Sequence, residues 1–171
     1  VVSATGIWSN PYIPEIEGRQ TFQGKQTHSA YYAGLDAYKG KRVLVVGAGN
    51  SGAQIFAELV QVTDASWVTR TPPQFLPDDV DGRVLFERAT KRVKNDANGD
   101  TQYSSEESDA PKGDIVMMPP VKAARDKGLL TTQPMFERLT EQGVVWPDGS
   151  EEKIDAIIWC TGFNPELEHL A

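Results

Sequence analysis

An apolar run, a glycine-rich turn and an amphipathic segment follow one another near the middle of the first half of the sequence. Residues 42–46 read RVLVV, without the polar alternation of a half-exposed strand, and so predict a strand buried on both faces of a parallel sheet. Apolar residues then recur at helical spacing over 51–62, with Asn50 as the expected N-cap. Residues 66–69 predict a second strand, which two prolines end. The pattern is that of one β-α-β unit.

The remainder of the chain has weaker periodicity. Residues 1–37 are interrupted by prolines and glycines and are predicted to be a linker, whereas 83–94 predict a helix. Residues 95–114 are polar and rich in Asp, Glu, Ser and Gly, which predicts a mobile insertion without enough apolar surface to order it.

A hairpin is predicted near the end of the chain. The run 143–146 and the run 154–159 are apolar, and Pro-Asp-Gly-Ser at 147–150 is a turn sequence between them. The elements together predict an α/β fold: a Rossmann-like parallel sheet with flanking helices and an antiparallel hairpin, in a domain that covers residues 38–163.

Composition excludes several classes of function. The net charge is −7 and the isoelectric point near 4.8, so the basic surface expected of a protein that binds nucleic acid or an anionic membrane is missing. No apolar stretch approaches the roughly 20 residues of a membrane span. The single cysteine, Cys160, excludes a disulfide within the chain and fits a reducing, cytoplasmic setting. The two histidines, His28 and His169, have no ligands at zinc spacing, so no metal site is predicted.

The turn between the first strand and the helix carries the strongest chemical signal. Residues 47–52 read GAGNSG, which is the G-x-G-x-x-G pattern in its required strand-turn-helix context. The first glycine permits the tight turn, the second lets a pyrophosphate approach the backbone, and the third lets the helix pack on its strand. The helix N-terminus then offers free N–H groups to the phosphates. The predicted pyrophosphate-binding residues are Gly47, Gly49, Asn50, Ser51 and Gly52.

The end of the second strand indicates which dinucleotide is bound. An NAD site would place Asp or Glu about 20 residues beyond the turn to bind the ribose 2′-hydroxyl. This chain has Arg70 there, between Thr69 and Thr71, and no carboxylate between Ala65 and Gln74. A guanidinium and hydroxyls suit a 2′-phosphate, which favours NADP(H). Thr161 and Gly162, after the last strand, are weaker candidates for contact with the nucleotide.

The motifs resemble those of the class B flavin-dependent monooxygenases, the flavin-containing monooxygenases and their relatives. Phe22-x-Gly24-x-x-x-His28-x-x-x-Tyr32 is similar to the fingerprint of that family, with the aromatic last position of the flavin-containing branch. The turn at 47–52, the segment 3–8 and the segment 155–163 resemble further motifs of the family, in the right order.

The resemblance implies a two-dinucleotide-binding-domain flavoprotein, in which NADPH reduces FAD and the reduced flavin activates oxygen for a small-molecule substrate. Residues 1–37 would then link this NADP(H)-binding domain to a missing FAD-binding domain, and 164–171 would return towards it. The fragment alone is expected to be inactive, and no catalytic residue is assigned within it. Cys160 stands where alanine is frequent in the family and is interpreted as a packing residue. For His28 two roles remain open: a structural hydrogen bond that holds the linker to the domain, or a part in turnover.

Two alternatives remain open at this stage. The pyridine-nucleotide domain of a flavin disulfide reductase shares the architecture but needs a cysteine pair elsewhere in its protein. A non-catalytic NADP-sensing module would bind the dinucleotide and report redox state to a partner protein.

Overall fold

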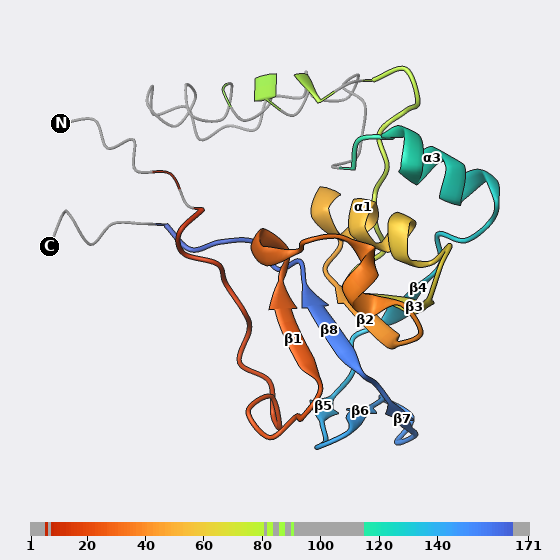
Figure 1. Cartoon of the computed structure of the whole chain (residues 1–171). Coiled ribbons are helices and arrows are strands. Elements are labelled where there is room, and N and C mark those ends of the chain that lie inside the picture. The colour runs from red at the N-terminus through yellow and green to blue at the C-terminus, as the bar shows by residue number, and fades with distance from the viewer. Residues whose placement is uncertain are drawn as a thin grey trace, which may run out of the picture.

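Five parallel strands form the central sheet of the computed structural model (Figure 1). The structure describes residues 6, 8–80, 82–83, 86–87, 90 and 115–165. In spatial order the strands are β1 (Lys25–His28), β8 (Ala156–Trp159), β2 (Arg42–Val46), β3 (Asp64–Thr69) and β4 (Thr132–Pro134). Every neighbouring pair is parallel. The predicted parallel sheet is therefore confirmed.

The central strands are buried on both faces, as the apolar run predicted. In β2, Val43 and Val45 point into one hydrophobic cluster, while Leu44 and Val46 point into the cluster on the other face. All four residues are at most 3% exposed. Because side chains alternate along a strand, a continuous apolar run is what a two-sided core requires.

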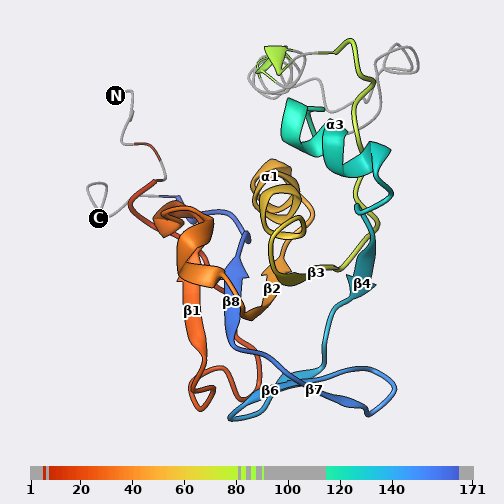
Figure 2. The same cartoon turned by 45° about the vertical axis from the view of Figure 1, so that its right-hand side comes forward.

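Helices cover one face of the sheet. Helix α1 (Asn50–Leu59) connects β2 to β3, and α3 (Pro119–Asp126) packs beside it, with the short helices η1 (Ser29–Tyr31) and η2 (Leu35–Tyr38) following β1. Figure 2 shows α1 and α3 together on one side of the sheet. The predicted β-α-β unit is confirmed, although the helix ends three residues earlier than its pattern suggested.

A small antiparallel sheet packs against the other face. It consists of β5 (Arg138–Leu139), β6 (Gly143–Val145) and β7 (Glu151–Lys153). Phe136, Leu139, Val144 and Trp146 from this region join Phe22 and the outer side chains of β2 and β8 in the second hydrophobic cluster. A hairpin is present, as predicted.

The second arm of that hairpin was assigned wrongly. The sequence pattern predicted residues 154–159 for this arm. In the structure, the arm is the polar strand β7, and β8 lies between β1 and β2. The physical reason is burial: β8 is buried along its whole length, as an interior parallel strand must be, whereas Glu151 and Lys153 of β7 are exposed.

Three further differences concern local structure. Residues 25–28, inside the predicted linker, form the edge strand β1. The Pro119-Pro120 pair opens α3 instead of merely breaking the chain, because proline is tolerated in the first turn of a helix. Gly49, not Asn50, is the N-cap residue of α1. The predicted insertion at 95–114 and most of the predicted helix at 83–94 lie outside the described residues.

Candidate functional site

The glycine turn between β2 and α1 has the geometry that its sequence suggested. Gly47 has φ +133°, and a Cβ on it would lie 2.2 Å from the carbonyl oxygen of Cys160. Gly52 is equally constrained, because its Cβ would lie 2.1 Å from the carbonyl oxygen of Gly47. A Cβ on Gly49, in contrast, would meet no atom within 4 Å. Gly47 and Gly52 are thus needed for packing, and Gly49 leaves an open approach to the backbone.

The carbonyl group of Gly47, the first residue of this turn, points towards the protein interior. The indole Nε1–H of Trp67, a fully buried residue of β3, donates to the Gly47 oxygen at 2.7 Å. The Gly47 N–H donates to the Val68 oxygen at 2.9 Å. The Gly47 oxygen, which would repel an anion, is therefore bonded to a buried indole, and the Gly49 N-cap adds no side-chain acceptor at the start of α1. The first-turn N–H groups of α1 suit an anion such as a pyrophosphate.

The turn lies where the order of strands reverses. From β2 the chain proceeds to β3 and β4 on one side, whereas β8 and β1 lie on the other side. The crevice at the carboxyl ends of strands at such a point is the usual ligand site of open α/β sheets. The Cys160 N–H donates to the Val46 oxygen at 2.8 Å, which brings the end of β8 directly beside the glycine turn.

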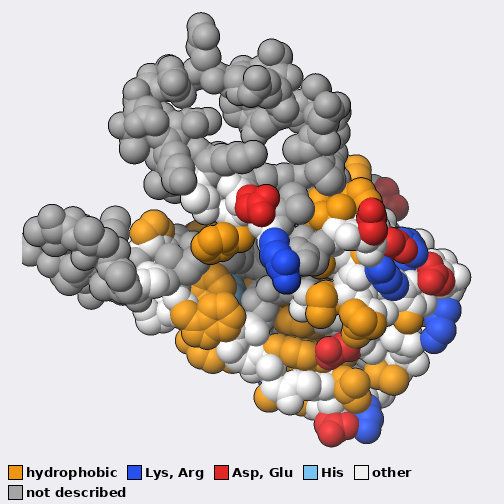
Figure 3. Space-filling view, turned by 90° about the horizontal axis from the view of Figure 1, so that it is seen from above, with side chains coloured by type: hydrophobic (Ala, Val, Ile, Leu, Met, Phe, Trp, Pro, Cys, Tyr) orange, Lys and Arg blue, Asp and Glu red, His pale blue; other side chains and the backbone are white. Residues whose placement is uncertain are grey.

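A pocket of about 300 Å³ opens at this crevice. Figure 3 views the molecule from above, looking towards the carboxyl ends of β1 and β8. The lining is mostly apolar, with one guanidinium and two hydroxyl-bearing threonines. Its residues are Tyr12, Pro14, Val46, Gly47, Ala48, Val68, Arg70, Thr71, Met135, Cys160, Thr161 and Gly162.

The pocket brings together half of the predicted site. Arg70 and Thr71 lie on one side of it and Thr161 and Gly162 on the other, with Gly47 between them. Gly49, Asn50, Ser51 and Gly52 belong to the adjoining start of α1 and do not line the pocket. Thr69 is 5% exposed and is also absent from the lining, so Arg70 and Thr71 are better placed than Thr69 to contact a ligand.

Three lining residues come from segments in which no site was predicted. Tyr12 and Pro14 belong to the N-terminal segment, and Met135 follows β4. The Tyr12 N–H donates to the Gly162 oxygen at 2.9 Å, and the Thr161 hydroxyl donates to the Tyr12 oxygen. These contacts join positions about 150 residues apart, for which the local sequence contains no signal.

His28 fastens β1 to the segment after β8. It is 2% exposed; its Nδ1 accepts a hydrogen bond from the Ala30 N–H, so the Nε2–H donates to the Gly162 oxygen at 2.9 Å. Its ring also meets Phe163 edge to face. Burial lowers the pKa of His28. These contacts support the structural role for this histidine.

Cys160 is a packing residue in this structure. It is 9% exposed, and burial raises the pKa of its thiol to about 12, with a smaller opposing contribution from a hydrogen bond to Ser29. A thiol that stays protonated at neutral pH is a poor nucleophile and a poor metal ligand. Among the described residues, no group of three or more His, Cys, Asp or Glu side chains is placed to hold a metal ion.

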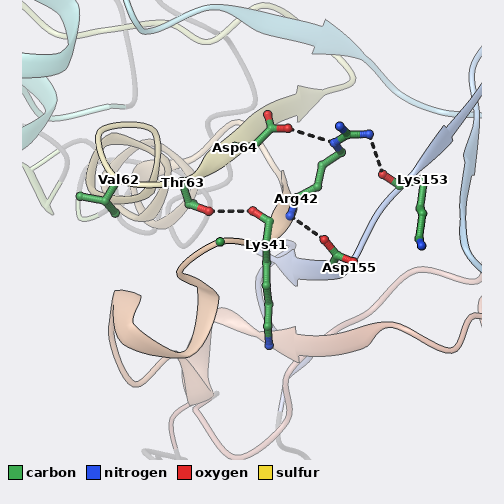
Figure 4. A pocket seen from close by; sticks show the side chains of 8 residues that line it. Lys41, Arg42, Val62, Thr63, Asp64, Lys153 and Asp155 are labelled. Carbon is green, nitrogen blue, oxygen red and sulfur yellow. Dashed lines mark hydrogen bonds and ion pairs between the residues drawn. The ribbon is translucent and has the colours of Figure 1, made fainter.

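A second pocket of about 400 Å³ lies at the amino ends of β2 and β3, near Lys41, Thr63 and Lys153 (Figure 4). Its carboxylates already have partners: Arg42 Nε donates to Asp64 at 2.9 Å, and the Arg42 backbone N–H donates to Asp155 at 2.8 Å. It lies at the edge of the sheet opposite to the glycine turn, so the smaller pocket is the better candidate for the functional site.

Comparisons with known proteins agree with this geometry. The family profile for flavin-binding monooxygenase-like proteins matches residues 1–77. A flavin-containing monooxygenase from Stenotrophomonas maltophilia is 44% identical, with a TM-score of 0.79 over 97% of this chain and 43% of the other. The indole-3-pyruvate monooxygenase YUCCA4 of Oryza sativa subsp. japonica is 27% identical over 99% of this chain and 44% of its own length. Over nearly its whole length, the chain is therefore similar to flavin monooxygenases.

The chain corresponds to only part of these relatives. It spans less than half the length of either relative. The solved relatives are flavin monooxygenases whose fold contains the described sheet as one part. No helix within the described ranges is long and apolar enough to cross a bilayer.

Proposed function

We propose that this chain is the NADPH-binding domain of an FAD-dependent monooxygenase, formed by residues 38–163 together with the edge strand β1. The observation that carries the proposal is the glycine turn at the point of strand reversal, beside a pocket that contains Arg70. FAD would supply the oxygen chemistry and NADPH the reducing equivalents. The residues of this chain would bind and orient the nicotinamide dinucleotide.

The pyrophosphate would lie at the start of α1. Gly49 leaves space for it, and the inward orientation of the Gly47 carbonyl removes a repulsive oxygen. The backbone N–H groups at the start of a helix are suited to an anion. Such a site allows a protein of net charge −7 to bind a pyrophosphate. The backbone dipoles at the helix start would hold the anion, so no basic surface is required.

Arg70 and Thr71 would bind the 2′-phosphate of NADP(H). Arg70 is exposed at the carboxyl end of β3 and lines the pocket with Thr71. A related observation supports this assignment. A Stenotrophomonas double mutant, in which adjacent Gln and His are replaced by Arg and Thr, is 46% identical to this chain, compared with 44% for the unmutated enzyme. Arg70-Thr71 is the one Arg-Thr pair in this sequence, so the rise is what matching at this pair would produce.

The side of the domain near Trp8 would face the FAD-binding part of the full protein. Trp8 is 70% exposed and stacks on Phe163 with ring centroids 4.9 Å apart. The Asn164 N–H donates to the Asn10 oxygen at 2.8 Å, so the segments near both ends of the described chain run together there. Exposed aromatic side chains beside an open pocket are typical of a surface that packs against another domain. Residues 1–37 and 164–171 would provide the two connections.

A calorimetric titration with NADP⁺ and NAD⁺ tests the nucleotide assignment. We expect NADP⁺ to bind at least about tenfold more tightly, roughly 1.4 kcal/mol, and Arg70→Ala to remove most of that difference. Arg42→Ala is the matched control, because it removes one positive charge at the opposite edge of the same sheet. Equal affinities in the unmodified chain would contradict the role of Arg70.

A further inference from the structure

We propose that Asn50 is a positioning residue that sets the preference for the 2′-phosphate from behind the turn, without touching that phosphate. The proposal rests on the proposed function, because it concerns NADP(H) bound at the same site. It differs from the sequence prediction, which placed the Asn50 side chain at the N-cap of α1 and the residue among the pyrophosphate ligands.

The side chain of Asn50 is bonded to a distant part of the chain. Its Oδ1 accepts a hydrogen bond from the Val116 N–H at 2.8 Å. Residue 116 follows Ile115, which is fully buried. The Asn50 side-chain carbonyl thus connects the first residue of the predicted phosphate-binding helix to the segment that precedes α3.

That segment is in turn bonded to the chain just beyond Arg70. The Ile115 N–H donates to the Gln74 oxygen at 3.0 Å, and the Leu76 N–H donates to the Ile115 oxygen at 2.8 Å. The two bonds form a parallel bridge between Phe75 and Ile115. Pro72 and Pro73 stiffen the short span from Arg70 to Gln74, because each fixes its own φ.

Aromatic side chains connect the Arg70 segment to the glycine turn. Phe75 meets Trp67 edge to face with ring centroids 6.3 Å apart, and Trp67 holds the Gly47 carbonyl. Phe56 of α1 stacks on Trp67, with ring centroids 5.5 Å apart. The glycine turn and the Arg70 segment are therefore held by one set of buried contacts, and the Asn50–Val116 bond is its polar connection at the start of α1.

Loss of that bond would affect the two phosphate subsites unequally. The pyrophosphate would bind backbone N–H groups of α1, which the helix itself holds in place. The 2′-phosphate would bind the Arg70 guanidinium in a charge-assisted contact that depends strongly on geometry. Without its acceptor, the Val116 N–H is left unsatisfied, and the bridge that holds residues 74–76 is free to shift.

Titration of Asn50→Ala and Asn50→Asp with NADP⁺ and NAD⁺ tests the proposal. We expect Asn50→Ala to weaken NADP⁺ binding at least about fivefold and NAD⁺ binding less than about twofold, which lowers the ratio of the two affinities. Asn50→Asp keeps an acceptor for the Val116 N–H and adds a negative charge near the pyrophosphate. It should therefore weaken both ligands and leave the ratio close to that of the unmodified chain.

The outcomes separate this inference from the proposed function. Equal losses of NADP⁺ and NAD⁺ affinity in Asn50→Ala would overturn it, because they indicate a direct pyrophosphate contact or general disruption. If the unmodified chain does not prefer NADP⁺, the proposed function fails first. If circular dichroism shows that Asn50→Ala does not fold, Asn50→Ser replaces it. The serine side chain is too short to reach the Val116 N–H. Asn50→Ser should therefore also lower the ratio of NADP⁺ affinity to NAD⁺ affinity.

Discussion

The two outer glycines and the middle glycine of the turn have different physical requirements. A Cβ on Gly52 would lie 2.1 Å from the Gly47 oxygen and 3.2 Å from the indole nitrogen of Trp67, whereas a Cβ on Gly49 would enter open space. We therefore expect Gly52→Ala to lower the free energy of unfolding by about 2 kcal/mol through overpacking. Gly49→Ala should keep near-normal stability but weaken NADP⁺ binding at least about tenfold, because its methyl group occupies the approach to the pyrophosphate.

Urea unfolding and calorimetric titration of both variants distinguish these effects. The pair forms its own control, because the same methyl group is added at two positions three residues apart. Normal NADP⁺ binding by a folded Gly49→Ala protein would contradict a pyrophosphate at this turn. Normal stability of Gly52→Ala would contradict the close packing of α1 on the turn.

At the scale of single residues, the sequence predicted which residues form the glycine turn better than it predicted where side chains point. The spacing of Gly47, Gly49 and Gly52 follows from local backbone requirements, so it could be recognised in one short segment. The directions of the Trp67 indole and the Asn50 amide could not, because their partners are a carbonyl 20 residues away and an N–H 66 residues away. Hydrogen bonds between distant segments depend on the tertiary fold and leave no periodic pattern.

At the scale of elements, the sheet was predicted where burial is two-sided and missed where it is not. Strand β2 was recognised from its continuous apolar run. Strand β1 has only one fully buried residue, His28, and occupies an edge, so its sequence does not differ from that of a loop. Strand β8 was recognised as a strand, but it was predicted to pair with β6, whereas it pairs with β2 and β6 pairs with β7. The turn sequence at 147–150 predicts a hairpin but does not indicate which later segment forms its second strand.

The attachment of β1 to the end of β8 should depend on pH through His28. The neutral ring accepts from Ala30 and donates to Gly162, and protonation of Nδ1 removes the first of these bonds. Since the pKa of His28 is lowered in the folded state, the unfolded chain binds the proton more readily below about pH 6.5. We expect the free energy of unfolding to fall as the pH decreases from about 6.5 through the folded-state pKa.

Urea unfolding at a series of pH values between about 8 and 5.5 measures this contribution. His28→Gln should be less stable at pH 8 by about 1–2 kcal/mol, and the difference from the unmodified chain should narrow as the pH falls. His169→Ala removes the other histidine of the chain and should retain the full pH dependence. A constant difference between His28→Gln and the unmodified chain across this range would exclude titration of His28 as the cause.

At the scale of the whole molecule, the two edges of the sheet serve different purposes. At the amino ends, charged side chains such as Arg42 and Asp64 pair with one another. At the carboxyl ends, the glycine turn, Arg70 and the Thr161-Gly162 segment surround an open pocket. This division follows from the parallel arrangement, because it gathers the carboxyl ends of all five strands at one edge. Under the proposed function, this edge binds NADPH, and the oxygen chemistry belongs to the FAD of the full protein.

The 171-residue chain should therefore bind NADP⁺ but not act as an oxygenase. We expect it to purify without flavin and, with added FAD, to oxidise NADPH no faster than FAD alone, as followed by nicotinamide absorbance and oxygen uptake. NADP⁺ at about a hundred times its Kd should still raise the free energy of unfolding by roughly 2.7 kcal/mol, and Arg70→Ala should lose most of that gain at the same concentration. Flavin retained through purification, or faster NADPH oxidation with this chain present, would contradict its assignment as the NADPH-binding half. Because stabilisation by NADP⁺ and the absence of turnover are measured on one sample, an unfolded preparation cannot account for both.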